Sequence, residues 1–304
     1  MIQHCLGCPV EEEAEPEDQS LPPLHRECAQ PDPSLANLQH LLSQGCDPNQ
    51  ICCQGRTPLH TLLQADHTPA TPLLPLVDTL LAAGASLALL DKTGSSALTS
   101  LAAQLAAGRI AETVAICERM LAGPACDVNH MDAADRTLLS YSVAYLDQTA
   151  DLTRVLVNHG ARVWPAPAPP PPVNVSDLTR DREQSAFTWF LRSAIQASSL
   201  AESTLTCLSH EMGRDPGRMR GHVMRVMLSE GKHPRVLGPL YRQLKLAMAP
   251  FWSEPQQLRY LAWNSIRKSM GPKRLSSGSR QLGLPSPLRR YLTLHSPRMS
   301  KESG

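Results

Sequence analysis

The 304-residue sequence lacks a long hydrophobic run, a rich aromatic content and an excess of charge of one sign. No stretch approaches the roughly 18 apolar residues of a membrane-spanning helix, so the sequence predicts none. With 29 basic and 28 acidic residues, the formal net charge is +1, which argues against a uniform field for a nucleic acid or an anionic membrane. The start MIQHCLGCPVEEE is acidic where a signal peptide is basic and then apolar. We expect a soluble intracellular protein in the cytoplasm, with the nucleus as a second compartment.

Catalytic and metal-binding motifs are also missing. No phosphate-binding loop, dinucleotide fingerprint, zinc-protease helix or nucleophile elbow occurs, so we expect no enzymatic activity and no cofactor. His4, Cys5 and Cys8 resemble half of a metal site, but no second pair follows at zinc-finger spacing, so we expect no metal. The nine cysteines are irregularly spaced in a long chain, which favours reduced thiols. A thiol or metal enzyme, with Cys52 or Cys53 as nucleophile, is the least supported alternative.

Differences in composition along the chain separate a helical region from segments that we expect to be disordered or extended. Aromatic residues make up 4% of it and there are 27 prolines, which together favour a helical array with a core of Leu, Val and Ala. Residues 1–32 hold eight acids against one base and predict a mostly disordered leader. Residues 165–184 contain PAPAPPPP, whose fixed φ and missing N–H groups predict an extended loop. Residues 251–304 hold ten bases against two acids, but without aromatics interleaved for base stacking, so we expect no nucleic-acid partner.

An internal repeat is present in the first half. Two apolar residues, two of any type and a glycine end at Gly45, Gly84 and Gly160, with Ala125 in a fourth, variant copy. A turn begins two residues after each of these positions. Ten residues after the first residue of the first three turns come Thr57, Ser96 and Thr137, each before an apolar segment. The constant offset predicts a fixed turn that joins variable helix pairs.

The chemistry of this turn supports the interpretation. Thr or Ser at these three positions would cap a helix, and proline after Thr57 suits the first helical residue. Gly55, Gly94 and Asp135, two residues earlier, suit a positive φ. We expect the extra length of each repeat between the paired helices, around 66–71 and 103–109.

The segment Thr57-Pro58-Leu59-His60 and the turns Gly45-Cys46-Asp47-Pro48-Asn49 and Cys126-Asp127-Val128-Asn129 resemble the ankyrin-repeat family. The resemblance implies a helical solenoid over 33–164, with about four repeats, the first partial. His60 would then be structural. Ser185-Ala186-Phe187-Thr188 has the form of an earlier helix start, and 225–231 parallels 154–160. We therefore expect one degenerate closing repeat over 185–231, within a helical cap over 185–250.

A further helix is expected after Ser253, which stands at capping-box spacing from Gln256. Its apolar stripe consists of Leu258, Leu261, Ala262, Ser265, Ile266 and Met270. Gly271-Pro272 would end it, and a short helix is predicted within Leu284-Pro285-Ser286-Pro287-Leu288-Arg289-Arg290-Tyr291-Leu292. A structural alternative is that the leucine helix only covers the open end of the solenoid.

The two pieces together resemble a SOCS box over 254–294, and an ankyrin array followed by this box is the layout of the ankyrin repeat and SOCS box family. The expected class is all-α: an ankyrin solenoid, a small three-helix SOCS box and a disordered tail over 295–304. The resemblance implies contacts with Elongin C by Leu258, Leu261, Ala262 and Ile266. It implies contacts with Cullin-5 by Leu284, Pro285, Pro287, Leu288, Tyr291 and Leu292. The family commonly has cysteine at position 262 and an aliphatic residue at position 286. We therefore expect weaker Elongin binding at Ala262, and the Cullin contact has less support from the residues than the Elongin contact because of Ser286.

The resemblance predicts a non-catalytic substrate-recognition subunit of an Elongin B/C–Cullin-5 RING ubiquitin ligase, with a protein substrate that the sequence does not identify. The alternative is an ankyrin scaffold without a link to ubiquitin. No membrane partner is expected. Substrate-binding positions are assigned by place in the turns alone; they are Gln54, Arg56, Lys92, Thr93 and Arg136.

Overall fold

The computed structural model describes residues 21–123, 125–163, 185–212, 216–230 and 234–252, with Ser265, Ile266 and Ser269. In this part the chain is helical, which confirms the all-α class. Its one β-type pairing there is an isolated bridge between Leu90 and Ser96. None of the described helices is both long and apolar enough to cross a membrane.

Several predicted segments lie outside the described residues. They are 1–20 of the acidic leader, 165–184, most of the leucine helix with Leu258, Leu261 and Ala262, the whole Cullin motif from Leu284 to Leu292, and 295–304.

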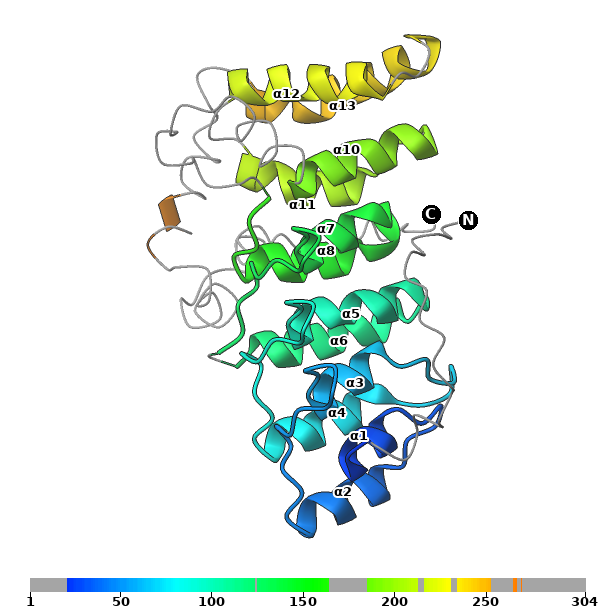
Figure 1. Ribbon diagram of the computed structural model, residues 1–304. Coiled ribbons are helices and arrows are strands. Elements are labelled where there is room, and N and C mark those ends of the chain that lie inside the picture. Colours follow the sequence, from blue (N-terminus) through cyan, green and yellow to red (C-terminus); the bar gives the residue numbers. More distant parts are fainter. Residues whose placement is uncertain are drawn as a thin grey trace, which may run out of the picture.

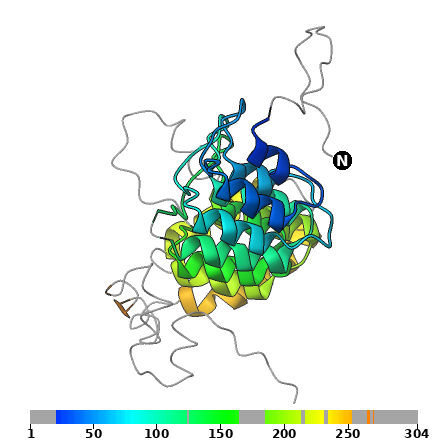
Figure 2. The same cartoon turned by 90° about the horizontal axis from the view of Figure 1, so that it is seen from below.

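The helices of the described residues alternate along the chain between two layers. The first layer holds α1 (Pro23–Cys28), α3 (Pro58–Gln64), α5 (Ala97–Ala106), α7 (Leu138–Ala144), α10 (Ala186–Ala197) and α12 (Pro216–Ser229). The second holds α2 (Leu35–Ser43), α4 (Leu73–Ala82), α6 (Ile110–Leu121), α8 (Ala150–Asn158), α11 (Glu202–Met212) and α13 (Pro234–Trp252), and a 3₁₀ turn, η2 (Leu146–Thr149), precedes α8. Each helix contacts the next one in its own layer (Figure 1). Seen from below, the helices overlie one another in a single stack (Figure 2). Buried apolar side chains form one cluster from Leu24 to Met248.

The turns form as the sequence predicts. Helices α3, α5 and α7 begin directly after Thr57, Ser96 and Thr137, whose hydroxyl oxygens accept the backbone N–H three residues later at 3.4, 3.3 and 3.3 Å. The residues two positions earlier have positive φ, +73° at Gly55, +71° at Gly94 and +55° at Asp135. The turn-and-cap chemistry is thus the same in all three turns.

The acidic leader is not unstructured through residue 32. Its last part contains α1, in which Leu24 and Cys28 are buried. Pro23 stands at the start of this helix, where its missing N–H costs no hydrogen bond. With six residues, α1 depends on its packing against α2 and α3, which the local pattern does not reveal.

The extra length of the repeats is only partly where it was expected. Residues 66–71 do lie between α3 and α4, but in the next repeat α5 continues through Ala106. Its Gln104 is buried, and Gln104 Nε2 donates to the Leu63 carbonyl oxygen at 2.8 Å. The repeat formed by α5 and α6 is therefore longer in its helices rather than in the loop.

The closing region differs more. One repeat was predicted over 185–231, but three helices lie there, and α13 follows, so 186–252 contains two helix pairs. Residues 225–229 belong to α12, which stacks on α10 in the first layer, whereas 154–158 belong to second-layer α8. Helix α11 was missed because part of its buried side is polar. Thr204 Oγ1 donates to the Leu146 carbonyl oxygen at 2.8 Å.

Two asparagines link successive turns. Asn49 Oδ1 accepts the Ser86 N–H at 2.7 Å and its Nδ2 donates to the Gly84 carbonyl oxygen at 3.0 Å. Asn129 makes the same pair with the Arg162 N–H at 2.7 Å and the Gly160 carbonyl oxygen at 3.1 Å. Each side chain thus satisfies two backbone groups of the following helix end.

We expect Asn49→Ala and Asn129→Ala each to lower the free energy of unfolding by about 1–3 kcal/mol, because two backbone groups lose their partners. Urea denaturation followed by circular dichroism measures this effect, with Gln54→Ala, an exposed change in the same turn, as the control. Equal midpoints for the asparagine variants and the control would contradict it.

Two buried histidines make stability depend on pH. His60 Nε2 donates to the Ser95 carbonyl oxygen at 3.2 Å, while its Nδ1 lies 2.8 Å from Thr57 Oγ1. His25 Nε2 donates to the Gln50 carbonyl oxygen at 2.9 Å. Burial lowers the pKa of both imidazoles. The unfolded chain, with histidine pKa values near 6.5, therefore binds protons that the folded chain does not.

The contribution of these two histidines to the free energy of unfolding should accordingly be complete above about pH 6.5 and should decrease as the pH falls below that value. We expect a lower urea midpoint at about pH 5.5 than at about pH 7.5, and a smaller difference in His60→Gln. His40→Gln, which changes an exposed histidine, should keep the wild-type difference. A pH dependence that is the same in all three proteins would assign the effect to other groups.

Candidate protein-binding surface

Three exposed apolar side chains occupy the same position in three successive turns. Ile51, Leu90 and Met131 are 60%, 47% and 56% exposed, and we call them the turn row. Each lies four residues after the start of its turn, at Asp47, Ser86 and Asp127. Apolar residues of this size are usually buried. Their recurrence at one position of successive turns, rather than their single exposure, makes the row a candidate interaction surface.

The closure of each turn explains why these side chains project into solvent. The residue after each row member donates its N–H across the turn at 3.0 Å: Cys52 to the Arg56 oxygen, Asp91 to the Ser95 oxygen and Asp132 to the Arg136 oxygen. The backbone folds back immediately after the row position in every case. The row side chains therefore lie outside the helix stack and its core.

The turns are also connected to one another. Lys92 N–H donates to the Gln54 carbonyl oxygen at 3.2 Å, and His130 Nε2 donates to the Gly94 carbonyl oxygen at 2.7 Å. A Cβ atom at Gly55 would lie 2.9 Å from the Lys92 nitrogen, so only glycine permits this approach. The turns lie one above another beside the helices (Figure 1). The row is thus presented by a connected scaffold.

The sequence-assigned substrate positions divide into two groups. Gln54 and Lys92 are exposed and Arg56 is half-buried, so their side chains are accessible. Thr93 is exposed, but its Oγ1 donates to Asp91 Oδ1 at 2.6 Å within its own turn. The Arg136 guanidinium lies 4.0 Å from the centre of the Trp189 ring. These last two side chains have structural partners.

Arg136 belongs to a cluster that joins the third turn to α7, α10 and the residue that follows α12. Its guanidinium carbon is also 5.5 Å from the Tyr141 ring. Tyr141 Oη donates to Asp132 Oδ2 at 2.6 Å, and burial, followed by this carboxylate, raises the pKa of Tyr141 to about 12. Arg192, 5.8 Å from the Trp189 ring, pairs with Glu230 at 3.0 Å. The cluster stabilises the position of the third turn.

Sequence reasoning missed the turn row. The available signal was that an apolar residue recurs at one position outside the predicted helices. From the sequence alone, an apolar residue near a helix start can equally be assigned to the core. Val128, in the same turn as Met131, does lie in the core.

Of the four residues predicted to bind Elongin C, the structure describes one, Ile266. Ile266 lies in a helical segment and is 37% exposed. The other three positions and all six Cullin positions lie outside the described residues.

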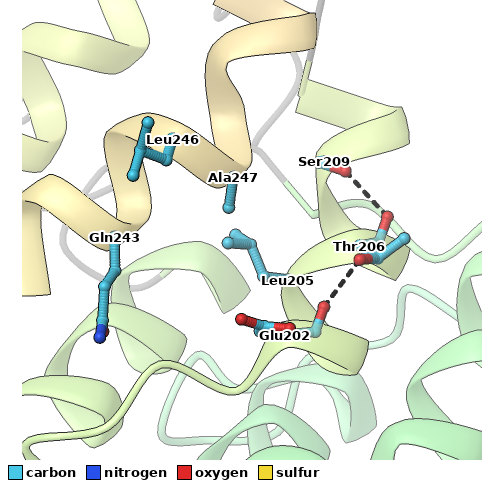
Figure 3. A pocket seen from close by; sticks show the side chains of 7 residues that line it. All are labelled: Glu202, Leu205, Thr206, Ser209, Gln243, Leu246 and Ala247. Carbon is cyan, nitrogen blue, oxygen red and sulfur yellow. Dashed lines mark hydrogen bonds between the residues drawn. The ribbon is translucent and has the colours of Figure 1, made fainter.

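A pocket of about 330 Å³ lies between α11 and α13. Its lining comprises Glu202, Leu205, Thr206, Ser209, Gln243, Leu246 and Ala247 (Figure 3). The two hydroxyls bond to their own helix: Thr206 Oγ1 donates to the Glu202 carbonyl oxygen at 2.7 Å and Ser209 Oγ to the Thr206 carbonyl oxygen at 2.8 Å. Glu202 is the one charged residue in this lining, and the pocket contains no nucleophile with an adjacent base.

The described part of the chain contains no group of side chains arranged for cysteine catalysis or for metal binding. Burial raises the pKa of Cys28 to about 12 and that of Cys207 to about 11, so both stay thiols. Cys52 and Cys53 are free thiols in the first turn. Among the residues described, no three His, Cys, Asp or Glu side chains gather as metal ligands.

Comparison of the sequence with protein-family models and with curated proteins gives no match.

The exposure of the turn row predicts that its side chains contribute little to the free energy of unfolding. Leu90→Ala should lower the free energy of unfolding by no more than about 1 kcal/mol, because Leu90 is 47% exposed and about half of its side chain is in water already. Leu98→Ala, the same change at a leucine that is 2% exposed, should cost about 2–5 kcal/mol. Urea denaturation compares the two. A loss of similar size at both positions would mean that the row is part of the core.

Proposed function

We propose that the chain is a substrate-recognition adaptor of an Elongin B/C–Cullin-5 RING ubiquitin ligase. In this proposal the turns of an ankyrin-type stack hold a protein target. A SOCS box over 254–294 holds Elongin B/C and Cullin-5. Other subunits carry out ubiquitin transfer, and this chain contributes proximity, which raises the effective concentration of target lysines at the charged ubiquitin carrier.

The turn row is the observation that carries the target-binding part. Ile51, Leu90 and Met131 expose apolar surface at equivalent positions of connected turns. Protein partners bury such surface, and the gain from burial is about 25 cal/mol per Å². Accessible polar groups beside the row, at Gln54 and Lys92, would supply orientation.

The ligase part rests on the resemblance of the C-terminal residues. The leucine stripe from Leu258 to Ile266 begins six residues after α13 ends at Trp252, and the Leu284-Pro285-Ser286-Pro287 segment follows it. Order and spacing after a helix-pair stack support the assignment. The exposure of Ile266 agrees with a side chain that is available to a partner.

A scaffold without a ubiquitin link is the second candidate, and one observation favours it. Leu228 of α12, in the last described helix pair, is 73% exposed. A following helix could cover such an end, as terminal repeats require. In that case the leucine stripe is a cap, and only the target-binding part of the proposal applies.

Capture of purified Elongin B/C by the full chain distinguishes the two candidates. We expect binding by wild type and at least a tenfold loss in Leu258→Ala/Ile266→Ala, because two apolar contacts are removed. Leu228→Ala, an exposed change outside the motif, should bind normally.

Circular dichroism and the urea midpoint establish whether each variant is folded. Absence of Elongin binding by wild type, or a double variant that binds normally, would refute the ligase assignment. A double variant with a much lower urea midpoint and unchanged binding would identify the leucine helix as a cap.

A further inference from the structure

We infer that the turn row binds an amphipathic α-helix of the target, with apolar side chains seven residues apart and acidic residues beside them. This inference rests on the protein-binding role proposed for the same turns. It adds the secondary structure, the spacing and the charge of the segment that binds.

The spacing of the row comes from the stack. Packed helices lie about 8–10 Å apart, so successive row residues recur at about that interval. Seven residues of α-helix advance about 10.5 Å, at 1.5 Å per residue. The stripe of an ideal helix drifts by about 20° per heptad, which is small over the two heptads that three contacts need. A helix lying along the stack can therefore contact Ile51, Leu90 and Met131 in turn.

The backbone of the turns disfavours an extended target. A peptide that adds to a sheet edge needs free N–H and C=O groups. In the second turn every N–H from Asp91 to Ser95 is already donated, to Asp91, Ser95 or Gln54 oxygens. In the third turn the N–H groups of Asp132, Ala134, Asp135 and Arg136 are also donated.

A helical target avoids this difficulty. Its backbone groups, away from its ends, are bonded within the helix, so recognition requires side chains alone. Side chains are what the row supplies, because the N–H groups that follow Leu90 and most of those that follow Met131 are donated within or between the turns, and the row side chains are exposed.

The charges of the first two turns favour acidic residues in the target. Asp47 accepts the Asn49 N–H at 2.8 Å, and Asp91 Oδ1 accepts the N–H groups of Thr93 and Ser95, each at 2.9 Å. Both carboxylates keep their negative charge, but each is held by backbone N–H groups of its own turn. The side chains of Arg56 and Lys92 have no hydrogen bond or ion pair in the described part of the chain. Arg56 lies across the first turn from Cys52, the residue after Ile51, and Lys92 follows Leu90 by two residues.

The test is selection from a displayed library of alanine-rich helices of about 22 residues, long enough for three heptads, with the outward positions randomised. The full chain is the bait. A second library contains proline-bearing peptides of the same length, which stay extended. The triple variant Ile51→Ser/Leu90→Ser/Met131→Ser serves as the comparison, and Leu228→Ser is a matched exposed change away from the turns.

We expect enriched helices with Leu, Ile, Met or Phe seven residues apart and with Glu or Asp beside them. Synthetic versions should bind wild type and Leu228→Ser equally, and the triple variant at least about tenfold more weakly. Because the row residues lie outside the core, the triple variant should stay folded, with only a small decrease in its urea midpoint.

Three outcomes would overturn the inference: no enriched helix, enriched helices without the seven-residue spacing, or equal affinity for the triple variant. Row-dependent binders from the extended library alone would overturn it as well. Elongin B/C capture by the same preparation separates this result from the ligase assignment. Capture without helix selection refutes only the target class, and helix selection without capture refutes only the ligase link.

Discussion

Burial between neighbouring helix pairs is the interaction on which the rest of the structure depends. Helices α3 and α7 have seven residues each, and isolated helices shorter than about 12–15 residues are marginal in water. Each pair becomes stable only when it covers, and is covered by, the next, which is why one apolar cluster runs from Leu24 to Met248. The packed helices also fix the conformation of the turns. A turn that joins two packed pairs has both of its ends fixed, so a side chain on it is held in place without belonging to the core.

Apolar stacking sets how strongly the helix pairs associate, and buried polar contacts set the register of helices both within a pair and between successive pairs. Ser142 and Thr153 lie 2.9 Å apart between the hydroxyl oxygens, joining α7 to α8. Thr188 Oγ1 lies 2.9 Å from His222 Nε2, joining α10 to α12. A buried polar atom without its partner is costly, so each such pair permits one alignment of two helices and penalises a slip. Together with the asparagines that link successive turns, these pairs bring equivalent turn positions into line.

What the sequence could predict follows from how local each feature is. The starts of α3, α5 and α7 depend on a cap residue and on a left-handed residue two positions earlier, all within a few residues, and they were predicted correctly. The short α1 and the polar α11 depend on contacts with distant segments, such as Thr204 with Leu146, and the pattern missed them. The same reasoning applies to the surface. Arg136 was assigned to substrate by its place in a turn, but its partner Trp189 comes from another repeat and beyond a proline-rich segment.

The turn row is the clearest case in which folding leaves a feature unexplained. One residue further along, Asp91 and Asp132 are needed, because each carboxylate bonds two N–H groups of its turn. At the row position the turn requires no particular side chain: the closing hydrogen bonds are made by the backbone of the neighbouring residue, and the side chain points away from the core. A polar residue would suit that geometry and would lower the tendency to aggregate. Three large apolar residues at such a position therefore contribute little to the stack. The protein target proposed above would supply the burial that accounts for them.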